Sequence, residues 1–190
     1  MQLTAETSPE TARDDRLTTI ELICADLARA KGQSPPRTLT TTLRLLLGSG
    51  LAIRSVATIG FRLAHRAGRV SPLAGSALKA ITHAITGADL DYRATIGPGF
   101  NLPHPTGVVI SAGTVAGKRC TLHQGVTLGS QPEGSPRLGN DVNLAPGARV
   151  VGNIILGSNV HVGSNSVVTH SFPEGHVTLV GIPAAPIKRD

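Results

Sequence analysis

Residues 138–168, LGNDVNLAPGARVVGNIILGSNVHVGSNSVV, place an aliphatic side chain at every sixth position. The spacing extends back to Ile96, and only Thr114 and Pro132 interrupt it. A period of six matches neither the helical repeat of about 3.6 residues nor the alternation of a plain strand. It is typical of a parallel β-helix, whose short strands turn a corner after six residues, and the stretch 96–168 has room for about four three-sided coils. The positions that share the spacing are Ile96, Leu102, Val108, Cys120, Val126, Leu138, Leu144, Val150, Leu156, Val162 and Val168.

The scarcity of aromatic residues argues against an ordinary β-sandwich, which is the alternative for a valine-rich and glycine-rich stretch with this spacing. The chain has only Phe61, Phe100, Phe172 and Tyr92 among its 190 residues. Large aromatic side chains usually contribute much of such a core. We therefore expect a narrow aliphatic core.

The net charge of +6 and the pI near 10.2 raise the question of a nucleic-acid or membrane-surface partner. The basic residues are spread through a helical region without clustering, which speaks against nucleic-acid binding. A polyanionic cofactor is a simpler explanation for part of the charge. The two cysteines, Cys24 and Cys120, define no disulfide framework. The spread basic residues are Arg37, Arg44, Arg54, Arg62, Arg66, Arg69 and Lys79.

The N-terminal residues 1–15 are polar, and we expect them to be frayed or disordered. They contain no apolar segment after a basic start, so no signal peptide is predicted. The longest apolar runs fall well short of the roughly twenty residues of a transmembrane helix, so membrane insertion is not expected. These features fit a reducing, cytoplasmic location.

A helical domain is predicted over residues 16–88. Helical spacing of apolar residues runs through 17–30, 39–67 and 71–86. Arginines alternate with aliphatic residues in the second of these segments, which is also typical of a helix on a membrane surface. We prefer packing against the solenoid, because a helix in that position needs one apolar face as well.

The composition changes near residues 87–89, where glycine, proline and β-branched residues become frequent. A β-helix domain is therefore predicted over 89–170. The tail, 171–190, is expected to pack back on the coil, because the last coil otherwise exposes an unpaired strand edge. Together these segments predict an α+β chain, with an N-terminal helical region followed by a parallel β-helix.

Six segments of the second half of the chain carry a resemblance to a known family: ADLDYRATIGPG, NLPHPTGVVI, TLHQGVTLG, RLGNDVNLAPGARVVGN, VHVGSNSVV and VGIPAAPI. FRLAH at 61–65 adds to it. On these motifs the chain resembles the hexapeptide-repeat acyltransferases, and within them the serine O-acetyltransferase branch. The resemblance implies a left-handed β-helix and a homotrimer, with a dimer of trimers left open. It also implies acetyl-CoA, or another acyl-CoA, bound between neighbouring coils.

The resemblance further implies a catalytic pair. In the family a histidine before a TG dipeptide is the general base, and an aspartate fifteen residues earlier orients it. The matching positions are His104 and Asp89. A hydroxyl attacks a thioester as its proton leaves, and an imidazole that titrates near neutral pH can accept that proton. A carboxylate behind the ring fixes the tautomer. Without the resemblance, Leu-Pro-His-Pro is more typical of a surface histidine in a turn than of a catalytic base.

Positions that contact CoA in the family are occupied here by small residues, as close approach of the cofactor to the backbone requires. The basic C-terminus is expected to meet the phosphates at the nucleotide end. The matching positions are Gly129 and Ser130 after the VTLG segment, Ala145, Pro146, Gly163 and Ser164 along the pantetheine arm, and Lys188 and Arg189 at the phosphates.

Histidines in a trimeric β-helix can also bind zinc, as in the carbonic-anhydrase-like branch. That branch has two histidines about five residues apart and a third well upstream, a spacing that His104, His123 and His161 lack. No metal site is therefore predicted. His123 stands where the family has an aliphatic residue, so it either lines the acceptor pocket or packs on the coil.

The acceptor side departs from the family pattern. Pro103 replaces the aspartate that binds the serine ammonium, Ser135 replaces a second histidine, and Ala112 replaces a glutamate. Loss of one buried charged partner costs on the order of 2–5 kcal/mol of binding. We therefore expect an acceptor that has diverged from free L-serine and that contacts Pro103, His123 and Ser135.

The sequence thus predicts an acyl-CoA-dependent acyltransferase. Its acceptor is expected to be a small molecule, the hydroxyl or amine of a biosynthetic intermediate, either free or bound to a carrier protein. Two alternatives stay open. One is genuine serine O-acetylation in cysteine biosynthesis, and the other is a non-catalytic β-solenoid scaffold.

Overall fold

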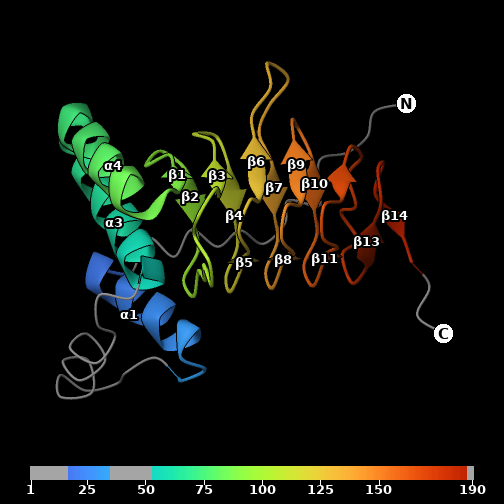
Figure 1. Cartoon of the computed structure of the whole chain (residues 1–190), viewed down its shortest axis with the longest axis horizontal. Coiled ribbons are helices and arrows are strands. Elements are labelled where there is room, and N and C mark those ends of the chain that lie inside the picture. Colours follow the sequence, from blue (N-terminus) through green and yellow to red (C-terminus); the bar gives the residue numbers. More distant parts are fainter. Residues whose placement is uncertain (1–16, 35–52, 188–190) are drawn as a thin grey trace.

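The computed structural model describes residues 17–34 and 53–187. Helices α1 (Thr19–Ala30), α3 (Ile53–Gly68) and α4 (Pro72–Thr86) gather at one end of a column of short strands (Figure 1). The column is the predicted left-handed parallel β-helix, and the helices precede it as predicted. Residues 1–15, and residues 39–52 of the second predicted helix, lie outside the described ranges.

Three sheets form the sides of the column. The strands pair in parallel along each side, except for one antiparallel pair at the C-terminal end. The first sheet contains β1 (Asp89–Leu90), β3 (Val109–Ile110), β6 (Thr127–Gly129), β9 (Arg149–Val151) and β12 (Val167–Val168). The second contains β2 (Thr95–Ile96), β4 (Val115–Ala116), β7 (Arg137–Leu138) and β10 (Ile155–Leu156). The third contains β5 (Thr121–Leu122), β8 (Asn143–Leu144), β11 (His161–Val162), β13 (Thr178–Val180) and β14 (Ala185–Pro186).

Each side of a coil buries two side chains rather than one. The strand residue points inward, and so does the residue two positions earlier, at the corner. Leu144 on β8 and Val142 before it are both fully buried, for example. Equivalent buried pairs of mostly aliphatic residues recur around the coil, and they give the interior that the scarcity of aromatic residues predicted.

The six-residue spacing changes its structural meaning along the chain. From Leu138 onward it marks strand residues, but between Val108 and Val126 it marks the buried corner residues. The shift arises because two extra residues in the corner after Leu102 move the strand positions to Ile110 and its successors. The longer loop between β6 and β7 then restores the phase. Both sets are buried, so the sequence shows no break where the phase changes.

Thr114, one of the two interruptions of the spacing, therefore lies at a corner. It is 1% exposed, and its hydroxyl lies 3.2 Å from the Ser111 hydroxyl, so the buried oxygen has a partner. The other interruption, Pro132, is exposed in the loop that links β6 to β7. Neither residue interrupts the inward stack.

The helices join the column through a shared core and a buried ion pair. Phe61 of α3 packs edge-on against Phe100 of the first coil, with ring centroids 6.1 Å apart. The Arg62 guanidinium donates to both Asp26 carboxylate oxygens, at 2.8 and 3.1 Å, and to the carbonyls of Ile96 and Gly97. Asp26 also accepts the Phe100 amide. One arginine thus ties α1, α3 and the first coil together.

Local sequence sets the ends of the helices. Thr18 and Glu21 form a reciprocal capping box at the start of α1. Ser71 caps α4, which Pro72 begins, and Gly87 closes it in the left-handed conformation with φ of 69°. The chain enters β1 two residues later, so α4 ends directly above the first coil.

The C-terminal residues cover the far end of the column. β13 adds in parallel to β11, and β14 turns back antiparallel on β13. Val167 of the last strand in the first sheet donates to the Gly181 carbonyl, and Ala184 donates back to the Val167 carbonyl. None of the described helices has the length and apolar character that a bilayer crossing requires.

Candidate active site

The corner that carries His104 stacks directly on the segment that carries Asp89. Gly107 donates a backbone hydrogen bond of 2.9 Å to the Gly87 carbonyl, and Asp89 donates one of 2.8 Å to the Val108 carbonyl. Buried Leu102 and Val108 anchor the two ends of this corner, while His104 between them is exposed. The longer corner thus projects the imidazole into solvent while the strands stay in register.

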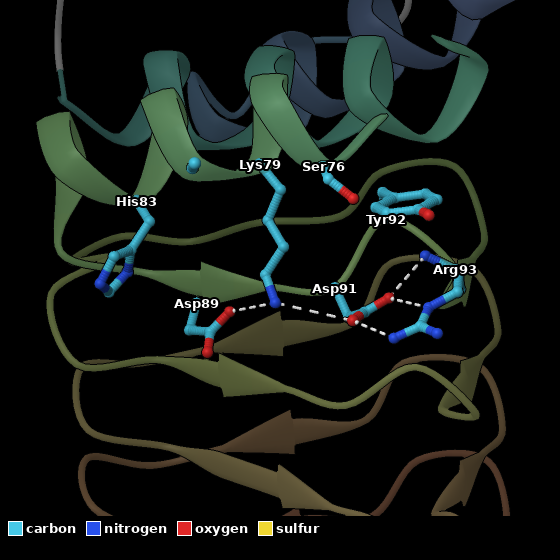
Figure 2. Close-up of a pocket in the computed structure, with 8 residues that line it drawn as sticks. Ser76, Lys79, His83, Asp89, Asp91, Tyr92 and Arg93 are labelled. Atoms are coloured by element: carbon cyan, nitrogen blue, oxygen red, sulfur yellow. Dashed lines mark hydrogen bonds and ion pairs between the residues drawn. The ribbon is translucent and has the colours of Figure 1, made fainter. Parts of the chain in front are cut away.

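The Asp89 carboxylate faces α4. Its Oδ1 atom lies 2.7 Å from the Lys79 ammonium, which also lies 3.6 Å from Asp91 Oδ2 (Figure 2). Among the hydrogen bonds of the described residues, 17–34 and 53–187, none joins the side chains of Asp89 and His104. The structure therefore brings the backbones of the predicted pair together and gives the carboxylate a cationic partner from the helical region.

A polar pocket opens between α4 and the first coil, with a volume of about 460 Å³. Figure 2 shows Lys79 reaching down from α4 between the two aspartates, with Ser76 and His83 on the same face of the helix. The pocket is lined by Ser76, Lys79, Ala80 and His83 from the helix and by Asp89, Asp91, Tyr92 and Arg93 from the coil.

Charge pairing inside this pocket is strong. Hydrogen bonds from Arg93 lower the pKa of Asp91 to about 2, against the opposing effect of burial, and the Lys79 charge adds to the shift. Arg93 Nε and its terminal nitrogen each donate at 2.9 Å to a different Asp91 oxygen. Burial alone lowers the pKa of Lys79, but the hydrogen bond and charge of Asp89, with Asp91, raise it overall. Both groups are therefore ionised at neutral pH.

His123 lies one coil beyond His104, on the same edge of the column. Gly125 donates a 3.1 Å backbone hydrogen bond to Thr106, which stacks the two corners. Burial lowers the pKa of the half-buried His123, and the nearby His104 lowers it further. His161, by contrast, is exposed on β11 of the third sheet, between Asn143 and Thr178. Of these two histidines, His123 is the neighbour of His104.

The positions predicted to contact the pantetheine arm lie farther along the same edge. Gly147 donates to the Gln124 carbonyl, and Asn165 donates to the Pro146 carbonyl, each at 2.9 Å. The corner with Ala145 and Pro146 therefore stacks on the His123 corner, and the corner with Gly163 and Ser164 stacks on it in turn. A Cβ atom at Gly163 would come within 2.8 Å of Val180, so this position allows no side chain without displacement.

Gly129 and Ser130 lie at a different edge, where the first sheet passes to the second. Here the loop between β6 and β7 projects from the column (Figure 1). The Ser130 hydroxyl lies 2.6 Å from that of Ser135 and donates to Ser111 at 2.7 Å. Ser135, predicted to contact the acceptor, therefore closes the base of this loop. Lys188 and Arg189 lie outside the described residues.

A model of the family described as bacterial transferase hexapeptide (six repeats) matches residues 135–170. The structure of a soybean serine acetyltransferase apoenzyme matches with a TM-score of 0.74 and 30% identity, covering 91% of this chain and 71% of that one. This chain belongs to the serine acetyltransferase family.

Two further relatives agree with this assignment. A serine acetyltransferase of Staphylococcus aureus (strain Mu50 / ATCC 700699) is 39% identical over 122 residues, which are 62% of this chain and 57% of the relative. A Brucella abortus strain S19 serine acetyltransferase in complex with coenzyme A is 26% identical, with a TM-score of 0.75, covering 87% of this chain and 66% of that chain. The chain thus spans little more than half the length of the S. aureus serine acetyltransferase.

The sequence did not reveal a role for three polar residues of the pocket in this serine acetyltransferase family member. Lys79, Asp91 and Arg93 were assigned no role, although Asp91 and Arg93 stand within four residues of Asp89. The available signal was the spacing of Ser76, Lys79 and His83, which places polar groups on one face of a helix. Across the described ranges, no group of three histidine, cysteine or acidic side chains is arranged to hold a metal ion.

Proposed function

We propose that this protein transfers an acetyl group from acetyl-CoA to the hydroxyl of L-serine, with His104 as general base. The stacking of corners along one edge carries the proposal, because it aligns His104 with the positions matched to the pantetheine arm. The coenzyme A complex of the Brucella relative supports the donor. The similarity to the serine acetyltransferase of S. aureus supports the acceptor.

The proposed reaction is a direct transfer. His104 takes the proton of the serine hydroxyl as the oxygen attacks the thioester carbonyl, and it returns a proton to the CoA sulfur as the carbon–sulfur bond breaks. Asp89 orients the imidazole and stabilises its protonated form. A cysteine nucleophile is not needed. Cys120 is 1% exposed, and burial raises the pKa of its thiol to about 12, so it is a poor nucleophile.

A second acceptor class is favoured by two of the residues that were predicted to contact the acceptor. Pro103, next to His104, offers no charge for a substrate ammonium, and Ser135 is engaged with Ser130. These residues support the diverged acceptor that the sequence predicted, a hydroxyl or amine compound that is free or carrier-bound. The similarity to serine acetyltransferases favours L-serine over this class.

We further propose a cytoplasmic homotrimer, with a dimer of trimers as the alternative assembly. Large apolar side chains exposed on the helical region support contacts between copies. Val70 and Leu73 are each 80% exposed, and Ile81 and Ile85 of α4 are more than half exposed. Light scattering of the full chain measures the number of subunits.

The deciding experiment measures thiol release from acetyl-CoA in the presence of L-serine, other hydroxyl and amino compounds, or no acceptor. We expect serine-dependent release by the wild type and a loss of about 10²- to 10⁴-fold in His104→Ala. His161→Ala, on the third sheet, serves as the matched control and should keep wild-type turnover.

Three outcomes would change the proposal. Turnover with another acceptor but not with serine would replace L-serine by that acceptor class. Unchanged turnover in His104→Ala would remove His104 as the base. Absence of turnover with every acceptor, together with no CoA binding by calorimetry, would leave the non-catalytic scaffold.

A further inference from the structure

The family resemblance did not indicate the contact between Lys79 and Asp89. Lys79 lies in the middle of α4, and its side chain, 28% exposed, crosses the pocket to the first coil (Figure 2). Its Nζ atom approaches Asp89 Oδ1 to 2.7 Å. That oxygen is buried and makes no hydrogen bond to any other described residue. One carboxylate oxygen of Asp89 therefore depends on one ammonium group.

The position of this ammonium is itself fixed. Asp91 Oδ2 attracts Nζ from the other side at 3.6 Å. Asp91 is in turn held by two side-chain hydrogen bonds and one backbone hydrogen bond from Arg93. Lys79 thus lies between two carboxylates, one of which is immobilised, so it cannot follow Asp89 freely into solvent.

The other Asp89 oxygen remains available. The Asp89 side chain is 45% exposed, and no hydrogen bond engages Oδ2 within the described part of the chain. The corner of His104 packs against the backbone on both sides of Asp89, through Gly87 and Val108. A carboxylate that is held by one oxygen and stacked on the histidine's corner has the arrangement that an orienting partner requires.

We propose that Lys79 is a positioning residue for the Asp89–His104 pair, holding one oxygen of Asp89 so that the other faces the imidazole. Because Asp89 has this role only under the proposed function, the inference rests on that function. The chemical consequence is double: Lys79 sets the direction of the carboxylate, and its charge offsets part of the carboxylate's charge.

The charge of Lys79 acts on the Asp89–His104 pair in a definite direction. The charged and titratable groups near the pair are Lys79 and His83 from α4, Asp91 and Arg93 from the first coil, and His123 from the next coil. Removal of the Lys79 cation leaves Asp89 with more uncompensated negative charge, which stabilises the protonated form of His104. The pH dependence of kcat/KM should therefore move to higher pH in a neutral Lys79 variant.

The test compares Lys79→Met with Lys79→Arg and with Lys31→Met, a matched loss of one lysine at the end of α1. We measure kcat/KM for the acetyl transfer against pH, together with the titration of the His104 imidazole by NMR, assigned with His104→Ala. Lys79→Met should lower kcat/KM about ten- to a hundredfold and move both midpoints to higher pH. Lys79→Arg and Lys31→Met should keep both midpoints.

A lysine that only tethers α4 to the coil would give a different result. Lys79→Met would then lower the melting temperature while leaving the His104 midpoint equal to that of Lys31→Met, and this outcome overturns the inference. If Lys79→Met does not fold, Lys79→Gln keeps a hydrogen-bond donor without the charge and tests the same shift. Wild-type protein without turnover would reject the proposed function, and the NMR titration would still decide whether Lys79 acts on His104.

Discussion

Side chains are positioned in different ways along the edge of the column that carries His104 and at the junction between the helices and the column. Along the edge, His104, His123 and the small residues of later corners are placed by a repeated backbone hydrogen-bond pattern. At the junction, the charged side chains of Lys79 and Arg62 reach from the helices to several partners in other elements. The edge therefore distributes its stability over many equivalent bonds, whereas the junction concentrates it in a few charged ones.

The largest expected effect on stability comes from removing one partner of the buried ion pair at the junction. Asp26→Ala leaves the Arg62 guanidinium, which has a 3% exposed side chain, without its carboxylate. We expect a loss of about 3–5 kcal/mol in the free energy of unfolding, because an uncompensated buried charge remains. Denaturant unfolding followed by circular dichroism measures the loss.

The double variant Asp26→Leu/Arg62→Met is the control for this pair. It removes both charges and should recover a large part of the stability that the single variant loses. Equal losses in the single and double variants would show that Arg62 acts mainly through its bonds to the Ile96 and Gly97 carbonyls.

The next largest effect on stability is expected from a cavity in the aliphatic stack of the column. Leu144 is fully buried between Leu122 and Val162 in the stacked strands. Leu144→Ala should lower the free energy of unfolding by about 2–5 kcal/mol, since the stacked coils can close the cavity only in part. Thermal unfolding with hydrogen exchange should show the loss in the coils on both sides. A change confined to the helical region would contradict this expectation.

A smaller effect is expected on the stability of the protein at low pH. Asp91 has an ordinary pKa of 3.8 that falls to about 2 in the folded protein, so its contribution to stability is complete above about pH 4 and disappears as the pH falls through 2. Asp91→Asn should be less stable than the wild type at pH 5, and the two unfolding curves should converge near pH 2. Parallel curves across this range would show that Asp91 takes up no extra proton on unfolding.

The smallest effect is expected at an exposed pair on the column. Arg119 Nε donates to Asp141 Oδ1 at 2.7 Å, but the Arg119 side chain is 50% exposed. Arg119→Gln should change the free energy of unfolding by less than about 1 kcal/mol, because solvent screens such pairs. A loss as large as that of Asp26→Ala would remove the contrast between the junction and the column.

The sequence allowed the column to be predicted because its spacing is local and repeated. The same regularity concealed the change of phase, since corner residues such as Cys120 are as buried as strand residues such as Leu122. The resemblance supplied Asp89 and His104, which remain a proposal. Lys79 could not be predicted, because its contact with Asp89 depends on how α4 lies over the first coil. The Asp26–Arg62 pair spans two helices and needed the packing as well.

The compensating changes of corner length have a practical consequence for protein engineering. A corner can gain residues while the strands on either side keep their partners, as the corner of His104 and the projecting loop between β6 and β7 both show. Segments grafted at these two corners should therefore alter molecular recognition without requiring a redesign of the scaffold. A library that varies length and composition there, and leaves the stacked aliphatic positions untouched, would be the economical way to seek new acceptor preferences.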